Sequence, residues 1–107
     1  MAIKVNLVID QGTDYTTNIN VTDDNDLPVD LAGWTGAAQM RKHYTSTISY
    51  PFNVSVSTGF VTLSMNSSST SAITAGRYVY DCELTDLTGK TSRLVEGIVT
   101  ITPQVTR

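Results

Sequence analysis

Apolar and polar residues alternate with a period of two along most of the chain, which is the pattern of β-strands with one buried face. Glycine, proline and Asp/Asn clusters separate the alternating segments, as expected of turns. We predict seven strands in this way, over residues 3–10, 15–22, 35–43, 52–57, 61–65, 78–84 and 92–102.

Seven short strands with almost no helix between them are typical of an all-β, immunoglobulin-like β-sandwich. Each sheet has one apolar face to bury, so the two sheets are expected to pack face to face, with all strands antiparallel. The length of 107 residues suits one domain, and we therefore predict a single domain over residues 1–107.

Four local details are predicted along with the strands. Thr70 is expected to cap one helical turn that runs through Ile73. Gly97 suits a β-bulge in the last strand. Tyr80 precedes Cys82 by two residues, which is the spacing of a tyrosine corner, and Cys82 itself is expected to be a small filler of the core.

The composition excludes several classes of function. Net charge is −3 and the sequence pI is about 4.7, which argues against nucleic-acid binding. Arg41 and Lys42 are the one adjacent basic pair and are expected at an exposed strand end. No apolar run approaches the roughly 20 residues of a membrane span, and the start lacks a signal peptide. We therefore expect synthesis in a host cytoplasm and no membrane insertion.

No motif for catalysis, metal binding or cofactor binding stands out. Asp23, Asp24, Asp26 and Asp30 lack the spacing of a calcium-binding EF-hand loop and are expected in an ordinary turn. A single histidine, His43, and a single cysteine are too few for a zinc site. Carboxylates such as Asp81 and Glu83 are expected to point outward rather than to form an acid/base pair. The chain is therefore predicted to be a non-enzyme without cofactor or metal.

Three aromatic residues lie outside the strongest apolar stripes: Trp34, Tyr44 and Tyr50. Exposed aromatic side chains anchor protein interfaces and stack on sugars. The alternative is that these three close the ends of the sandwich. The polar loop from Tyr44 to Tyr50 is our predicted contact surface, since binding residues are commonly found on loops.

Five segments carry a resemblance to a known family: "IDQGTDY", "DLAGWTGAAQMRKHYTS", "GFVTLSM", "AGRYVYDCEL" and "RLVEGIVTITPQVTR". In this order they resemble small virion structural proteins of tailed phages, notably myoviruses of marine cyanobacteria. They are also similar to the N-terminal immunoglobulin-like domain of phage baseplate upper proteins and to tail-fibre domains. The resemblance covers nearly the whole chain, and the family supplies no catalytic residues to transfer.

The resemblance implies a structural role in the virion, as capsid decoration or as a neck, baseplate or tail-fibre piece. The expected partners are other virion proteins, with a homo-oligomer as a further possibility. Because no fibre shaft or receptor-binding head follows the domain, a self-contained accessory piece is expected. The alternative function is a module that binds glycans or receptors on the host surface, which predicts that Trp34, Tyr44 or Tyr50 is exposed. A small hydrolase centred on His43 is the least favoured alternative.

Overall fold

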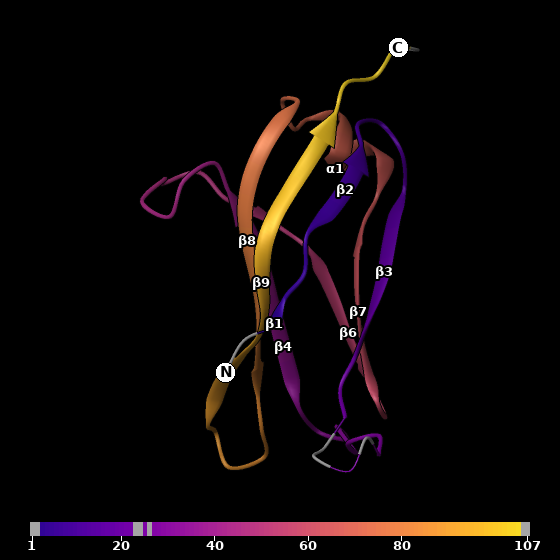
Figure 1. Cartoon of the computed structure of the whole chain (residues 1–107), viewed down its shortest axis with the longest axis vertical. Coiled ribbons are helices and arrows are strands. Elements are labelled where there is room, and N and C mark those ends of the chain that lie inside the picture. Colours follow the sequence, from indigo (N-terminus) through magenta and orange to yellow (C-terminus); the bar gives the residue numbers. More distant parts are fainter. Residues whose placement is uncertain (1–2, 23–24, 26, 106–107) are drawn as a thin grey trace.

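The chain folds as a two-layer β-sandwich (Figure 1), seen in a computed structural model that describes residues 3–22, 25 and 27–105. This confirms the predicted fold class. The larger sheet contains β1 (Ile3–Lys4), β2 (Leu7–Asp10), β4 (Thr35–Arg41), β5 (Tyr50–Pro51), β8 (Gly76–Thr85) and β9 (Thr91–Thr102). The smaller sheet contains β3 (Tyr15–Asn20), β7 (Phe60–Met65) and β6 (Asn53–Ser57), in that spatial order. One short helix, α1 (Ser67–Ser71), follows β7.

The structure divides the chain into more strands than the predicted number of about seven, and two pairings are not antiparallel as predicted. The described residues form nine strands, and β1 and β2 both run parallel to β9. The predicted strand 3–10 is interrupted after Lys4, where the Asn6 carboxamide oxygen accepts the backbone N–H of Ile98 at 3.1 Å. Alternation reports which face of a strand is buried and carries no information on the direction of its partner, so the sequence could not reveal the parallel pairing.

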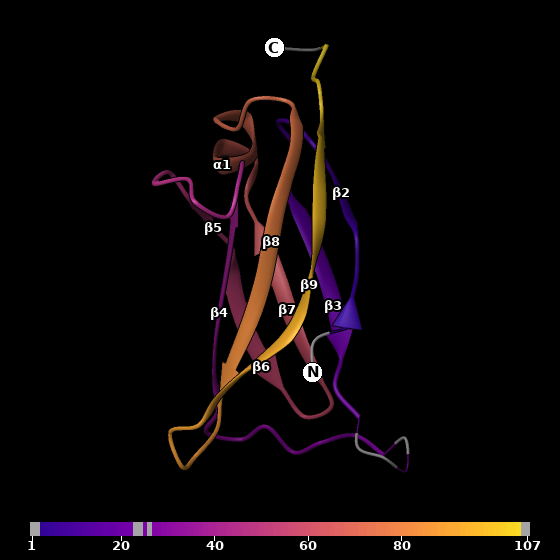
Figure 2. The same cartoon turned by 60° about the vertical axis from the view of Figure 1, so that its left-hand side comes forward.

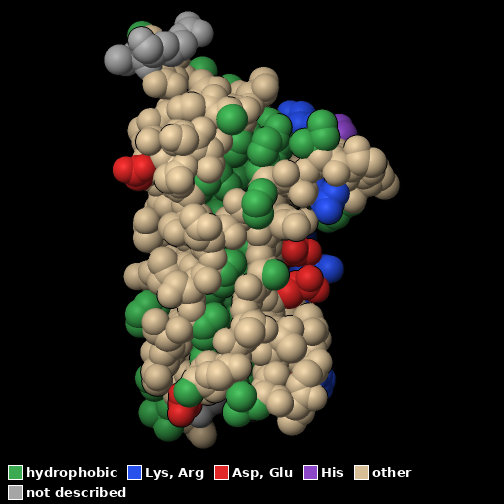
Figure 3. Space-filling model, turned by 180° about the vertical axis from the view of Figure 1, so that it is seen from behind, with side chains coloured by type: hydrophobic (Ala, Val, Ile, Leu, Met, Phe, Trp, Pro, Cys, Tyr) green, Lys and Arg blue, Asp and Glu red, His purple; other side chains and the backbone are tan. Residues whose placement is uncertain are grey.

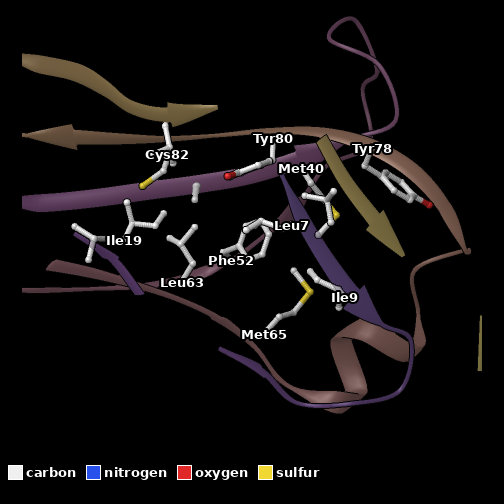
Figure 4. Close-up of a cluster of buried hydrophobic side chains, with 14 of the residues drawn as sticks. Leu7, Ile9, Ile19, Met40, Phe52, Leu63, Met65, Tyr78, Tyr80 and Cys82 are labelled. Atoms are coloured by element: carbon white, nitrogen blue, oxygen red, sulfur yellow. The ribbon is translucent and has the colours of Figure 1, made fainter. Parts of the chain in front are cut away.

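The core lies between the sheets and is filled from both sides by the alternating residues (Figure 4). Ile9, Met40 and Cys82 come from the larger sheet, and Val61 and Leu63 from the smaller one; all five have less than 2 % of their surface exposed. The rings of Phe52 and Tyr80 meet edge to face, with centroids 6.1 Å apart. The predicted inward faces, including Cys82 as a core filler, are confirmed.

The bulge predicted at Gly97 is wrong. Pairing between β8 and β9 shifts between Cys82, opposite Val95, and Glu83, opposite Arg93, so that Leu94 is the extra residue. Gly97 serves a different purpose, because a Cβ atom at this position would collide with the carbonyl oxygen of Val5. A glycine is thus needed where the chain between β1 and β2 approaches β9.

The tyrosine corner predicted at Tyr80 is also wrong. The Tyr80 hydroxyl donates to the carbonyl oxygen of Val5 at 2.6 Å, which is 75 residues away in the sequence. The local bond of a tyrosine corner is made by Tyr78 instead, whose hydroxyl donates to the carbonyl oxygen of Thr74 at 2.6 Å. Tyr78 stands near the start of β8, on the same face as Tyr80. The two-residue spacing to Cys82 therefore indicated a tyrosine that lies two residues further along the strand than the one that makes the local bond.

The helix begins and ends earlier than predicted. Asn66 is its N-cap, with the side-chain oxygen accepting from the backbone N–H of Ser69 at 2.8 Å. Thr70 lies inside the helix and is fully buried. Its hydroxyl accepts the N–H of Gly12 at 3.0 Å and donates to the carbonyl oxygen of Thr13 at 2.8 Å. Thr70 therefore attaches α1 to the turn between β2 and β3, a contact that local sequence does not reveal.

Candidate functional site

A loop of residues 42–49 between β4 and β5 projects from the sandwich (Figure 2). Its base is fastened by Ser46: the Arg41 guanidinium donates to the Ser46 carbonyl oxygen, and the backbone N–H of His43 donates to the Ser46 hydroxyl at 3.0 Å. Two hydrophobic side chains on the loop remain in solvent, with Tyr44 81% and Ile48 67% exposed. A loop that is held by hydrogen bonds and exposes apolar side chains is typical of a contact surface rather than of a linker.

A groove of about 410 Å³ lies between this loop and the connection from α1 to β8. It is lined by Lys42, Ser46, Thr47, Ile48, Tyr50, Thr74, Ala75 and Tyr78, and we call it the loop groove. The rings of Tyr50 and Tyr78 meet edge to face at 5.9 Å, and the ammonium of Lys42 lies 5.0 Å from the centroid of the Tyr78 ring. Hydrophobic side chains gather beside the projecting loop when the molecule is seen from behind (Figure 3).

Tyr44 borders a second area, on the outer face of the larger sheet. It lines two hollows of about 120 and 360 Å³ together with Val79, and Ile98 lines the larger one. Val79 and Ile98 are opposite each other in the pairing of β8 with β9. Val8 on β2 is 62% exposed and is opposite Thr100, next along the same outward face of β9. We call Val79, Ile98 and Val8 the apolar strip. The 42–49 loop thus lies between the loop groove and this strip on the larger sheet.

Charged side chains near this area pair with each other on the surface. Arg93 contacts Asp81 at 3.4 Å and Glu96 at 3.1 Å. These groups are substantially exposed to water, so each pair contributes little to stability. The placement agrees with the outward orientation predicted for Asp81 and Glu83.

The other candidates for chemistry that the structure describes take structural or solvent-facing positions. In the part of the chain that the structure describes, no three His, Cys, Asp or Glu residues are grouped to hold a metal ion. The Asp30 carboxylate accepts the N–H of Ala32 at 3.0 Å, whereas Asp23, Asp24 and Asp26 lie outside the described residues. His43 is exposed just after β4. Burial, together with the charges of two neighbouring carboxylates, raises the pKa of the Cys82 thiol to about 11, which disfavours a reactive thiolate.

The structure does not bring the three predicted aromatic residues together. Trp34 precedes β4 and Tyr44 follows it, so the seven residues of β4, about 23 Å of strand, separate them. Trp34 and Tyr50 are partly buried against the core, whereas Tyr44 is exposed. Sequence analysis missed Ile48, although an isolated isoleucine in a loop of serine and threonine was a usable signal.

Comparison with known proteins finds a similarity in fold and none in sequence. No protein-family model matches the sequence, and no curated protein matches it. Among solved structures, the chain is similar to a mutant of the SrpA adhesin from Streptococcus sanguinis, with a TM-score of 0.51 and 11% identity over 92% of this chain. It spans 55% of that structure's chain. A likeness at this identity establishes a shared β-sandwich and nothing further. No helix in the described ranges is long and apolar enough to cross a membrane.

Proposed function

We propose that this chain is a structural component of a tailed-phage virion that acts through protein–protein contacts. The observation that carries the proposal is the set of exposed hydrophobic side chains around the 42–49 loop. Tyr44, Ile48 and Val8 are each more than 60% exposed, and Ile98 is 41% exposed. Exposed apolar groups on and beside a projecting loop are typical of an interaction surface. The resemblance to virion proteins supplies the kind of partner, namely other virion proteins.

The geometry suits repeated docking rather than catalysis. The 42–49 loop offers two different apolar areas, the loop groove on one side and the strip beside Tyr44 on the other. A partner that engages both buries aromatic surface at the centre of the contact, where interface energy concentrates. In a virion many copies act together, so weak single contacts suffice.

Replacing both Tyr44 and Ile48 by serine is expected to abolish incorporation into particles while leaving the fold intact. Both side chains are exposed, so their loss changes folding stability by less than about 0.5 kcal/mol. The measurement is the copy number per particle, by quantitative mass spectrometry, when a phage lacking its own gene is complemented by the variant. Leu87→Ser is the matched control, because Leu87 is 73% exposed in the turn between β8 and β9, at the opposite end of β4. Normal incorporation of the double variant would show that the loop is not the contact.

The virion assignment itself is tested by purifying particles of the phage that encodes the chain. The protein should be present in many copies and should account for a sandwich-shaped density in cryo-electron microscopy of the particle. Its absence from purified particles would refute the assignment.

Binding of a host-surface glycan is a second candidate, favoured by the loop groove. Tyr50, which is partly exposed, supplies aromatic surface there, with the buried Tyr78 behind it, and Ser46, Thr47 and Thr74 bring hydroxyl groups to the lining. Sugars bind to such combinations of ring surface and hydrogen-bonding groups. The test is a glycan array with the wild-type chain and with Ile48→Ser. Signals that the variant loses would support this candidate, and an array without signals would remove it.

A further inference from the structure

We propose that β3 is an association edge that pairs, antiparallel, with β3 of a second copy of this chain. The proposal goes beyond the virion assignment, and its test does not depend on it. β3 is an outer strand of the smaller sheet, and among the described residues β7 is its one neighbour there. It lies at the margin of the molecule in Figure 1. An outer strand presents unpaired backbone N–H and C=O groups that fit another extended strand.

β3 lacks the devices by which proteins protect such edges. Its six residues contain no proline and no charged residue, and all six pair with β7 in one unbroken register. Natural edges are instead blocked by charges, proline, bulges or very short strands. An unblocked edge of this length is therefore an interaction site.

The remaining edges of the sandwich do carry protection. β5 has two residues, one of which is Pro51. β1 and β2 are short and carry Lys4 and Asp10 at their ends. β6 is uncharged, but the chain entering it donates the Phe52 backbone N–H to the Ala38 carbonyl oxygen of β4 at 3.0 Å, and Val54 fills the space beside Gly36 of β4, so β4 approaches this edge closely. The comparison leaves β3 as the open edge in the described part of the chain.

A second copy is the occupant that the residues of β3 favour. A strand that pairs with itself places like residues opposite one another, so a charged strand would repel its own copy. The outward side chains of β3 are Thr16, Asn18 and Asn20, which are uncharged and both donate and accept hydrogen bonds. Asn18 already accepts such a bond from the Thr62 hydroxyl at 2.7 Å.

A two-fold axis that passes through Asn18 and relates the two copies of β3 keeps residues of the same face opposite one another. It sets Asn18 opposite its own copy and Thr16 opposite Asn20, so that outward residues meet outward residues. On the inward face, Thr17 would meet Ile19 and extend the core across the contact; Thr17 is half-buried in the single chain. A strand pair this short buries less than a standard interface, so the expected Kd is roughly micromolar to millimolar.

The test is sedimentation velocity of the isolated chain, from about 10 µM to about 1 mM. Wild type should show a monomer–dimer equilibrium. Asn18→Lys should weaken it by roughly tenfold or more, because two ammonium groups then face each other. Ser55→Lys is the matched control, since Ser55 is an exposed residue of β6 on the same sheet and should change nothing. Circular dichroism verifies that both variants fold.

Mixing two variants of opposite charge tests whether β3 pairs with β3 of a second copy. Asn18→Lys and Asn18→Glu should each dimerise more weakly than wild type when alone and should form a one-to-one heterodimer when mixed, which native mass spectrometry detects. A wild-type chain that stays monomeric over the whole range overturns the proposal, as does equal weakening by Asn18→Lys and Ser55→Lys. These outcomes are independent of particle composition, so a chain absent from virions would refute the proposed function and leave the dimer standing.

Discussion

Replacing Leu63 by alanine is expected to lower the free energy of unfolding by about 2–5 kcal/mol. Leu63 lies in the middle of β7, has no exposed surface and is labelled in the centre of the cluster in Figure 4. Leu63 is opposite Thr17 on β3 and Val54 on β6. Because both neighbouring strands are hydrogen-bonded to β7, they cannot move inward to fill the cavity that the truncated side chain would leave. Domains of this kind have a total stability of about 5–15 kcal/mol, and this one side chain therefore accounts for a large share.

Urea denaturation followed by tryptophan fluorescence gives the measurement. The midpoint should fall while the dependence of the free energy on urea stays unchanged, because the same surface is exposed on unfolding. Leu87→Ala is the control: it removes the same atoms from a residue that is 73% exposed and should change stability by less than about 0.5 kcal/mol. A loss below about 1 kcal/mol for Leu63→Ala would mean that the sheets do not enclose this residue as described.

The fold class could be predicted because each strand reports its own buried face. Ile9, Met40, Leu63 and Cys82 are inward and fully buried, as the period of two indicates, and the strands predicted over residues 52–57 and 61–65 are found as β6 and β7. These are local properties, decided by a residue and its near neighbours. The pattern was correct even in β4, where two alanines and a glycine dilute it, because Ala38 and Met40 are both buried.

Contacts between remote segments could not be predicted. The parallel pairing of β2 with β9, the attachment of Thr70 to Gly12 and the bond from Tyr80 to Val5 each join residues more than 50 positions apart. The loop groove arises in the same way, from residues 42–50 and 74–78. Sequence analysis located the loop, but the depth of the groove depends on Tyr78 and Thr74, whose side of the molecule only the tertiary fold sets. The virion role and its partners stay predictions.

Raising the pH is expected to destabilise the protein steeply between about pH 9 and pH 12. Burial, more than neighbouring charge, raises the pKa of Tyr80 from 10.0 to about 12 and that of Cys82 from 9.0 to about 11. Both groups are neutral in the folded core, and the unfolded chain loses these protons at lower pH than the folded chain does. The stabilisation is therefore complete below pH 9, falls as Cys82 and then Tyr80 ionise in the unfolded state, and is lost once the folded pKa values are passed.

The size of this loss is comparable to the upper end of that expected for the core substitution. Each pH unit between the unfolded and folded pKa costs about 1.4 kcal/mol for each group, so the two together remove roughly 5–6 kcal/mol once both folded pKa values are passed. Urea midpoints measured from about pH 7 to about pH 11.5 should fall accordingly, and Cys82→Ala should flatten the part of the curve that begins near pH 9. Tyr80→Phe should cost about 1 kcal/mol at neutral pH, through the bond to Val5, and regain it at high pH.

The double variant Tyr80→Phe with Cys82→Ala separates this mechanism from general alkaline repulsion. Its free energy of unfolding should still fall above about pH 10, but by less than that of wild type, because burial also raises the pKa values of Tyr15 and Tyr78. A growing excess of negative surface charge would act on wild type and double variant alike, since both carry the same exposed ionisable groups. Identical pH profiles for the two proteins would therefore contradict the assignment to Tyr80 and Cys82, and with it the dry interior from which the raised pKa values arise.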